Sequence, residues 1–140
     1  MDMTDLNIDT LARTIYGEAR GESEEGKQAI ANVVLNRVAL ADAHPHFGLG
    51  TAASACKAPF QFTCWNKNDP NCQVISNVTD EDPVFAECLQ IASDALDGYL
   101  QDLTNGATYY YVTGSVEPAW AYQHEPCAII GRHQFYKNIA

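Results

Sequence analysis

Two apolar helical patterns, separated by a glycine and a serine, occupy most of the first forty residues. In the first pattern, over residues 7–20, apolar side chains recur at steps of three and four residues, at Ile8, Leu11, Ala12, Ile15 and Ala19. A helix is therefore predicted here, beginning at Asn7 or a nearby aspartate and ending before Gly21. One stripe of this helix is predicted to face a hydrophobic core.

The second helix is predicted to begin directly after Ser23. A serine at this position is a typical N-cap, and the two glutamates that follow it are favourable in the first turn of a helix. The pattern extends to about Ala41, and its predicted buried face consists of Ala29, Ile30, Val33, Val34 and Val38.

The remaining segments predict a third helix and a small sheet. Residues 42–73 show no clear period and are predicted to form a long irregular segment with one short helix near residues 51–56. Asp82 and Pro83 form a strong start signal for a helix over residues 83–100, whose apolar positions are Phe85, Cys88, Leu89, Ala92, Ala95, Leu96 and Tyr99. The β-prone runs 108–112 and 131–136 are predicted to pair as antiparallel strands. The predicted fold class is α+β, mainly helical.

Length and charge limit the functions to consider. A chain of 140 residues with 46% hydrophobic residues can bury one core, so we expect a single domain over residues 1–140. The formal net charge of -10, from 8 basic and 18 acidic residues, argues against nucleic acid as a partner. We expect a monomer.

Five cysteines, at positions 56, 64, 72, 88 and 127, leave at least one thiol unpaired in a monomer. Their spacing matches no zinc-ligand pattern. We expect one or two disulfides in the region from Cys56 to Cys72, with Cys127 as a further partner, and the alternative is five free thiols.

Glu18 lies at the end of the first predicted helix, between Gly17 and Gly21. A carboxyl group that apolar neighbours partly bury has its charged form disfavoured, so its pKa is expected to rise toward the range of a proton donor. A solvated glutamate at a helix end is the alternative.

Residues 11–38, LARTIYGEARGESEEGKQAIANVVLNRV, resemble the signature of the SleB-type cell wall hydrolases, which include spore cortex-lytic enzymes and related phage and bacterial peptidoglycan hydrolases. Further segments are similar to the same family in the same order: QFTCWN at 61–66, GATYYY at 106–111, PAWA at 118–121 and IGRHQFY at 130–136. The resemblance covers nearly the whole chain.

This resemblance implies a lysozyme-like fold with a substrate groove between a helical body and a smaller lobe. It implies a muramidase that cleaves the bond between N-acetylmuramic acid (MurNAc) and N-acetylglucosamine (GlcNAc) in peptidoglycan glycan strands. The glutamate of the motif, Glu18, would be the general acid and later the general base. Lytic transglycosylation needs one such carboxylate, because the acetamido group can stabilise the cation and the muramic 6-hydroxyl closes to a 1,6-anhydro product.

Ordinary hydrolysis, as in a lysozyme-type endolysin, would point to a second carboxylate. Glu22 follows Glu18 by four residues, and Glu25 lies at the start of the second predicted helix. The alternative for both is helix-end electrostatics, or an ion pair with Arg20 or Arg37.

Sugar binding calls for aromatic faces and polar groups. The candidates are Gln61, Phe62, Thr63, Trp65, Asn66, Tyr109, Tyr110, Tyr111, Trp120 and His133. Phe62 and Trp65 could instead anchor a loop, and His133 could be a structural hydrogen-bonding residue. Because side chains alternate along a strand, Tyr110 is predicted to point away from Tyr109 and Tyr111.

Other chemistries fit less well. A metal-dependent amidase needs about three ligands, and the only close pair, His44 and His46, lacks the helical H-E-x-x-H context. A cysteine peptidase would need Cys64 positioned beside His133. A non-catalytic glycan-binding module would not need to retain Glu18. We therefore expect no metal and no cofactor.

The first residues, Met1–Asp5, have neither the positive charge nor the apolar run of a secretory signal, and no run approaches the roughly 20 apolar residues of a membrane span. We therefore expect synthesis in the cytoplasm, no membrane insertion and action at the cell wall. Release would follow the route of phage lysins, or an export signal would have been removed.

Overall fold

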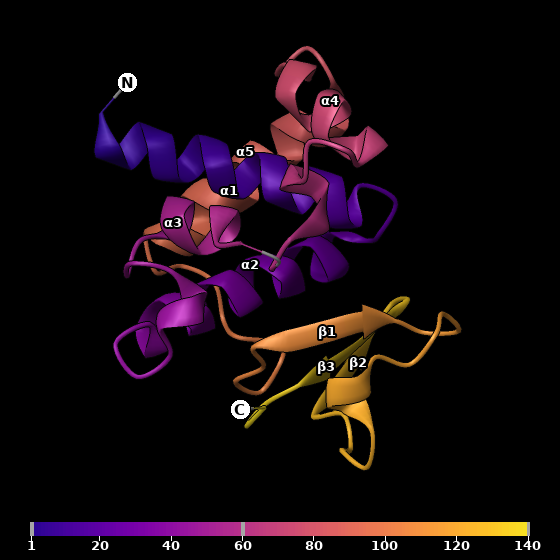
Figure 1. The fold of residues 1–140 in the computed structure, drawn as a ribbon. Coiled ribbons are helices and arrows are strands. Elements are labelled where there is room, and N and C mark those ends of the chain that lie inside the picture. Colours follow the sequence, from indigo (N-terminus) through magenta and orange to yellow (C-terminus); the bar gives the residue numbers. More distant parts are fainter. Residues whose placement is uncertain (1, 60, 140) are drawn as a thin grey trace.

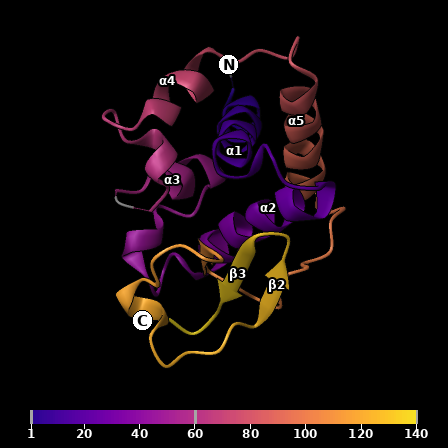
Figure 2. The ribbon, with the colours of Figure 1, turned by 90° about the vertical axis from the view of Figure 1, so that its right-hand side faces the viewer.

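The computed structural model describes residues 2–59 and 61–139. Its helical body is built around α1 (Met3–Ala19), which packs against α2 (Glu24–Leu40), α3 (Ala52–Lys57), α4 (Pro70–Asn77) and α5 (Pro83–Leu96). Figure 2 shows α1 enclosed by these four helices. The predicted apolar stripe faces the core, and Leu11, Ala12 and Ile15 are fully buried. Complete burial of one such leucine or isoleucine contributes about 1.5–3 kcal/mol.

The helix starts follow capping side chains. Ser23 Oγ accepts a hydrogen bond from Gly26 N at 3.2 Å, as predicted for α2. Asp82 caps α5 by accepting from the backbone of residues 84 and 85, also as predicted. α1 begins at Met3, four residues before the predicted residue 7, and an aspartate near that start, Asp2, caps it.

Two predictions about helix extent need correction. α5 ends at Leu96 rather than near residue 100, because Gly98 adopts a φ of 81°, and Tyr99 is exposed rather than buried. Residues 42–73 are more ordered than predicted. Besides α3, which Thr51 caps, they contain 3₁₀ turns at Pro45–Phe47 and Thr63–Trp65 and the beginning of α4, which Asp69 and Pro70 start.

A three-stranded antiparallel sheet packs beside α2 (Figure 1). β1 (Tyr109–Val112) and β2 (Ala128–Ile130) both pair with β3 (His133–Tyr136), so the strand order is β1-β3-β2. The pairing of β1 with β3 was predicted and places Tyr110 opposite Phe135. The short strand β2 was not predicted. The α+β, mainly helical fold with a small antiparallel sheet is confirmed.

All five cysteines are free thiols, so the predicted disulfides are wrong. Cys56, Cys64 and Cys88 are buried in the hydrophobic core. The Cys127 thiol donates to the Thr104 carbonyl at 3.1 Å, and the Cys72 thiol to the Trp65 carbonyl at 3.6 Å. Each sulfur therefore has its own packing or hydrogen-bonding environment.

None of the helices in residues 2–59 and 61–139 combines the length and the apolar character that a membrane span requires.

Candidate active site

A cavity of about 320 Å³ lies where the end of α1 meets α2, the turn at residues 61–65, β1 and the 3₁₀ turn Ala119–Ala121. Its lining side chains come from all five of these segments. They are Glu18, Arg37, Gln61, Thr63, Tyr109, Tyr110 and Trp120. Six of the seven were candidates from the sequence, and Arg37 was considered only as an ion-pair partner.

Glu18 is half-buried one residue before the end of α1, and the Tyr110 hydroxyl donates a hydrogen bond to its Oε1 atom. Burial, together with the negative charge of Glu18 and this hydrogen bond, raises the pKa of Tyr110 well above its ordinary value. The phenol therefore stays protonated and remains a donor to the carboxylate. Among the described residues that line the cavity, Glu18 is the only carboxylate.

Gly17 lets the turn at residues 63–65 approach α1 closely. A Cβ atom on Gly17 would lie 2.8 Å from Cys64 Cβ and 2.9 Å from its Sγ, which is too close for unbonded atoms. The space beside Gly17 is therefore filled by Cys64. This contact places Thr63, the residue before Cys64, in the cavity with Glu18.

Arg37 is the buried cation of the cavity, with 3% of its surface exposed. Its Nε donates to the Thr108 carbonyl at 2.7 Å, and its guanidinium carbon lies 4.7 Å from the centroid of the Phe62 ring and 5.2 Å from those of Phe47 and Tyr109. The buried Nη1 has no hydrogen-bond partner among the described residues. Burial lowers the pKa of Arg37.

A sequence signal for Arg37 existed. It follows Ile30, Val33 and Val34 at the spacing of the buried face of α2, so a charge falls where an apolar residue is expected. A charged side chain is rarely buried without a partner or a function. The residues that Arg37 contacts, in β1 and in the turn at residue 62, are distant from it in the sequence.

The aromatic candidates divide between the cavity and the core. Tyr109 and Trp120 line the cavity with their ring centroids 4.9 Å apart. Tyr111 lies on the same side of β1 and packs against Trp120 and Tyr136. The ring of Tyr110 packs on the other side of β1, against Phe62 and Phe135, as the predicted alternation requires, while its hydroxyl reaches Glu18 in the cavity.

Three candidates from residues 61–66 lie outside the cavity lining. Phe62 is buried beneath the guanidinium of Arg37. Trp65 is half-buried and donates from Nε1 to Thr14 Oγ1 at 2.8 Å, with Lys57 Nζ 4.6 Å from its ring centroid. Asn66 is exposed after the turn. The structure thus brings Gln61 and Thr63 together with Glu18.

Glu22, a candidate second carboxylate, is bound elsewhere. It is buried, and it accepts from Arg132 N at 2.9 Å and from Arg132 Nε at 2.6 Å. The hydrogen bond from the Arg132 backbone is the main cause that lowers the pKa of Glu22. Its partner is therefore neither Arg20 nor Arg37. Glu25 is exposed in the first turn of α2.

His133 is buried behind the cavity. Its Nδ1 lies 3.8 Å from Glu22 Oε1 and has no hydrogen-bond partner among the described residues, and its ring meets that of Tyr110 edge to face. Burial lowers the pKa of His133, which favours the neutral ring. This places His133 under Tyr110 rather than in the cavity lining.

The residues of the other candidate chemistries occupy structural positions. The rings of His44 and His46 pack against Phe47. Burial, aided by the nearby charge of Glu18, raises the pKa of the Cys64 thiol, whereas a cysteine nucleophile requires a thiolate.

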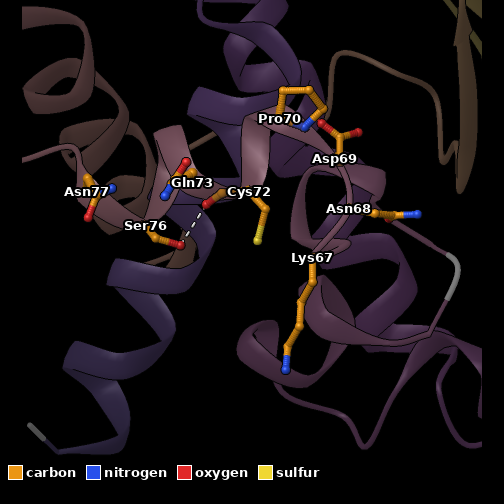
Figure 3. A pocket seen from close by; sticks show the side chains of 8 residues that line it. All are labelled: Lys67, Asn68, Asp69, Pro70, Cys72, Gln73, Ser76 and Asn77. Carbon is orange, nitrogen blue, oxygen red and sulfur yellow. Dashed lines mark hydrogen bonds between the residues drawn. The ribbon is translucent and has the colours of Figure 1, made fainter.

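A second hollow, of about 520 Å³, lies on α4 and the loop before it (Figure 3). The Ser76 hydroxyl in its wall donates to the Cys72 carbonyl at 2.7 Å. Its lining residues are Lys67, Asn68, Asp69, Pro70, Cys72, Gln73, Ser76 and Asn77. It shares no lining residue with the cavity that contains Glu18.

Residues 21–136 match a family model described as Cell Wall Hydrolase. The match begins three residues after Glu18, so it does not itself include this glutamate. Curated relatives include two spore cortex-lytic enzymes. That of Halalkalibacterium halodurans is 31% identical over 132 residues, and that of Bacillus subtilis strain 168 is 32% identical over 129 residues. The aligned parts cover 94% and 92% of this chain but only 35% and 37% of those two proteins.

Two solved structures are similar over nearly their full length. The catalytic domain of the Bacillus cereus SleB protein has a TM-score of 0.73 at 27% identity, covering 95% of this chain and 91% of that one. The catalytic domain of the germination-specific lytic transglycosylase SleB from Bacillus anthracis has a TM-score of 0.72 at 27% identity, covering 94% of each chain.

Proposed function

The chain belongs to the Cell Wall Hydrolase family, as its sequence motifs predict, and from this membership we propose that it cleaves the glycan strands of bacterial peptidoglycan. The bond cleaved is that between MurNAc and GlcNAc, and the reaction is a lytic transglycosylation. Residues 1–140 act as one catalytic domain in this proposal. The B. anthracis SleB domain, which is similar in fold, is described as a lytic transglycosylase.

In the proposed mechanism, Glu18 donates a proton to the glycosidic oxygen as the bond to the muramic C1 breaks. The acetamido oxygen of the same sugar stabilises the positive charge that develops at C1. The Glu18 carboxylate then accepts the proton of the muramic 6-hydroxyl, whose oxygen closes on C1 to form the 1,6-anhydro product. Water is not consumed, and Glu18 ends the cycle protonated, as it began.

The position of Glu18 is the observation that carries this proposal. It is half-buried in a cavity between the helical body and the sheet, and Tyr110 holds one of its carboxyl oxygens. A fixed carboxyl in a partly desolvated cavity is a suitable arrangement for general acid–base catalysis. A mechanism with one carboxylate also agrees with the lining residues, since the other two candidates, Glu22 and Glu25, lie outside it.

The sugar-binding residues in this proposal are those that line the same cavity. Trp120 and Tyr109 present aromatic surface against which a sugar ring can pack. Gln61 and Thr63 supply an amide and a hydroxyl for the polar edges of the sugar. Aromatic and polar groups that line the same cavity as Glu18 would hold a glycan beside it.

Mass spectrometry of the muropeptides released from purified sacculi tests the reaction. We expect products that end in 1,6-anhydro-MurNAc. Reducing MurNAc ends would instead assign a hydrolytic muramidase, of the lysozyme or endolysin type. Free stem peptides would assign an amidase and contradict cleavage of the glycan. Comparing sacculi with spore cortex, which contains muramic lactam, tests which wall is preferred.

Glu18→Gln tests the assigned residue, because glutamine preserves the size of the side chain but cannot donate a proton as the acid does. We expect turnover of sacculi to fall roughly 10²- to 10⁴-fold, the range for loss of a general acid or base. The melting temperature should change little. Glu81→Gln, on an exposed turn before α5, is the matched control and should keep full activity. Full turnover by Glu18→Gln would refute the assignment.

A further inference from the structure

The guanidinium of Arg37, in the wall of the cavity, has more hydrogen-bond donors than the described part of the protein supplies acceptors. A guanidinium carries five N–H donors and no acceptor. The described residues supply one hydrogen-bond acceptor, the Thr108 carbonyl, and three aromatic faces. Nη1 is buried without an acceptor. An unsatisfied buried donor of this kind is costly and uncommon, so it calls for a specific explanation.

Glu18 does not supply the missing acceptor. Arg37 and Glu18 line the same cavity, yet none of the ion pairs among the described residues joins them. The cavity therefore places a buried donor and a carboxylate around one space that a substrate sugar can enter. A sugar in this space could lie with its ring beside Glu18 while one of its substituents accepts the missing hydrogen bond from Arg37.

We propose that Arg37 is a substrate-binding residue whose guanidinium donates to an acyl oxygen carried by the sugar that lies beside Glu18. This inference rests on the proposed function, since it takes a peptidoglycan glycan as the ligand. A neutral acyl oxygen suits the site better than a free carboxylate, because the carboxylate that Glu18 becomes when it donates its proton would repel a second negative charge. It also suits the site better than a hydroxyl, because a carbonyl oxygen only accepts hydrogen bonds.

Two acyl groups of the glycan offer this chemistry. The acetamido carbonyl occurs on every sugar of the strand, whereas the lactyl carbonyl occurs only on muramic residues. Both would accept from the Arg37 guanidinium in the same way. Probes that carry one or both groups therefore distinguish them.

Binding is measured by calorimetry in a Glu18→Gln background, so that no probe is turned over. The first probe is a tetramer of N-acetylglucosamine, which has acetamido groups only. The second is a GlcNAc-MurNAc tetrasaccharide whose lactyl carboxyls are joined to L-alanine amide, so that it has both acetamido and neutral lactyl carbonyls. For a charge-assisted hydrogen bond, Arg37→Lys should weaken binding roughly 10- to 100-fold. Loss for both probes identifies the acetamido oxygen, and loss for the muramyl probe alone identifies the lactyl oxygen.

Arg13→Lys is the matched control. Like Arg37, Arg13 donates to backbone carbonyls of a distant segment, here Ile75 and Val78. Its guanidinium likewise lies over an aromatic ring, that of Phe85. It is not among the residues that line the cavity. Both lysine variants should lose stability, but only Arg37→Lys should lose affinity. Unchanged affinity of Arg37→Lys for both probes would overturn the proposal.

A measurement without substitution at Arg37 covers the case in which Arg37→Lys does not fold. In protein with ¹⁵N-labelled arginine, the Arg37 guanidinium resonances should shift when the muramyl probe saturates the Glu18→Gln protein, and those of Arg13 should not. Unmoved Arg37 resonances at saturation would refute the proposal. Cleavage of either probe by Glu18→Gln would be visible by mass spectrometry, so a failure of the role assigned to Glu18 is distinguished from a failure of Arg37 to bind the acyl oxygen.

Discussion

The hydrogen bond between Glu18 and Tyr110 joins the end of the first helix to the first strand of the sheet, 92 residues later. It holds the carboxyl group in one orientation relative to the cavity. Tyr110 is itself held by packing against Phe62, His133 and Phe135. The orientation of Glu18 therefore depends on a buried cluster of rings rather than on its own helix alone.

Tyr110→Phe preserves this ring packing and removes only the hydroxyl donor. We expect kcat on sacculi to fall about tenfold or more, because a hydrogen bond to a charged group contributes about 1.5–3 kcal/mol. The melting temperature should change by only a few degrees. Initial rates and thermal unfolding, measured on the same preparation, check both parts.

Tyr16→Phe is the control for this experiment. The Tyr16 hydroxyl donates to Asp82 Oδ2 at 2.7 Å, so the variant also removes a tyrosine–carboxylate hydrogen bond, but away from the cavity. It should lower the melting temperature and leave the rate per folded molecule unchanged. Equal losses of rate in the two variants would show that the effect of Tyr110 is general destabilisation.

At the scale of elements, Glu22 ties the turn between α1 and α2 to the turn between β2 and β3. Its two hydrogen bonds from Arg132 span 110 residues. Gly131 is required at this contact, because it has a φ of 57° and a side chain there would overlap Glu22 Oε1. The tie joins the sheet to the helical body.

This tie predicts how stability depends on pH. The pKa of Glu22 is lowered in the folded protein from the ordinary value of 4.5, so its charged form stabilises the fold above that pH. The stabilisation should be lost as the pH falls from about 4.5 through the folded pKa. Glu22→Gln should melt about 5 °C lower at pH 7, for a loss of one to two kcal/mol in a domain of this size.

Thermal unfolding of both proteins between pH 3 and pH 7 checks this expectation. The difference in melting temperature between wild type and Glu22→Gln should narrow as the pH falls below the ordinary glutamate pKa. A difference that stays constant across the whole range would mean that the charge of Glu22 does not stabilise the fold.

The sequence predicted the elements whose signals are local. Ser23 and Asp82 cap their helices with backbone groups two or three residues away, so the starts of α2 and α5 could be predicted. The start of α4 was missed although Asp69 and Pro70 repeat the signal of α5, because the surrounding residues show no helical period. β2 has three residues, which is too short for an alternating pattern.

The candidate site was predictable only in part, because local sequence signals do not reveal contacts between distant residues. Glu18 and most of the lining residues fall in recognisable motifs. The role of Arg132 as the partner of Glu22, and that of Thr108 as the partner of Arg37, depend on contacts across 110 and 71 residues. No local pattern carries such contacts.

At the scale of the whole molecule, five free thiols distinguish this fold from one held by disulfides. A titration of the denatured, unreduced protein with a thiol reagent should count all five. The melting temperature should be the same with and without a reducing agent, because no cross-link contributes to stability. In the native state, Cys56, Cys64 and Cys88 should react slowly because they are buried. A count of three or fewer would show that a disulfide forms.

Glu18 is synthesised before Tyr110, which orients it and comes 92 residues later in the chain. Since chains are made from the N-terminus, α1 can form well before the strand that completes the site exists. A product that stops before β1 would carry the acid without its donor and without Tyr109 and Trp120. The cavity around Glu18 would thus be complete only once Trp120 has been made, and chains that stop before β1 would lack it.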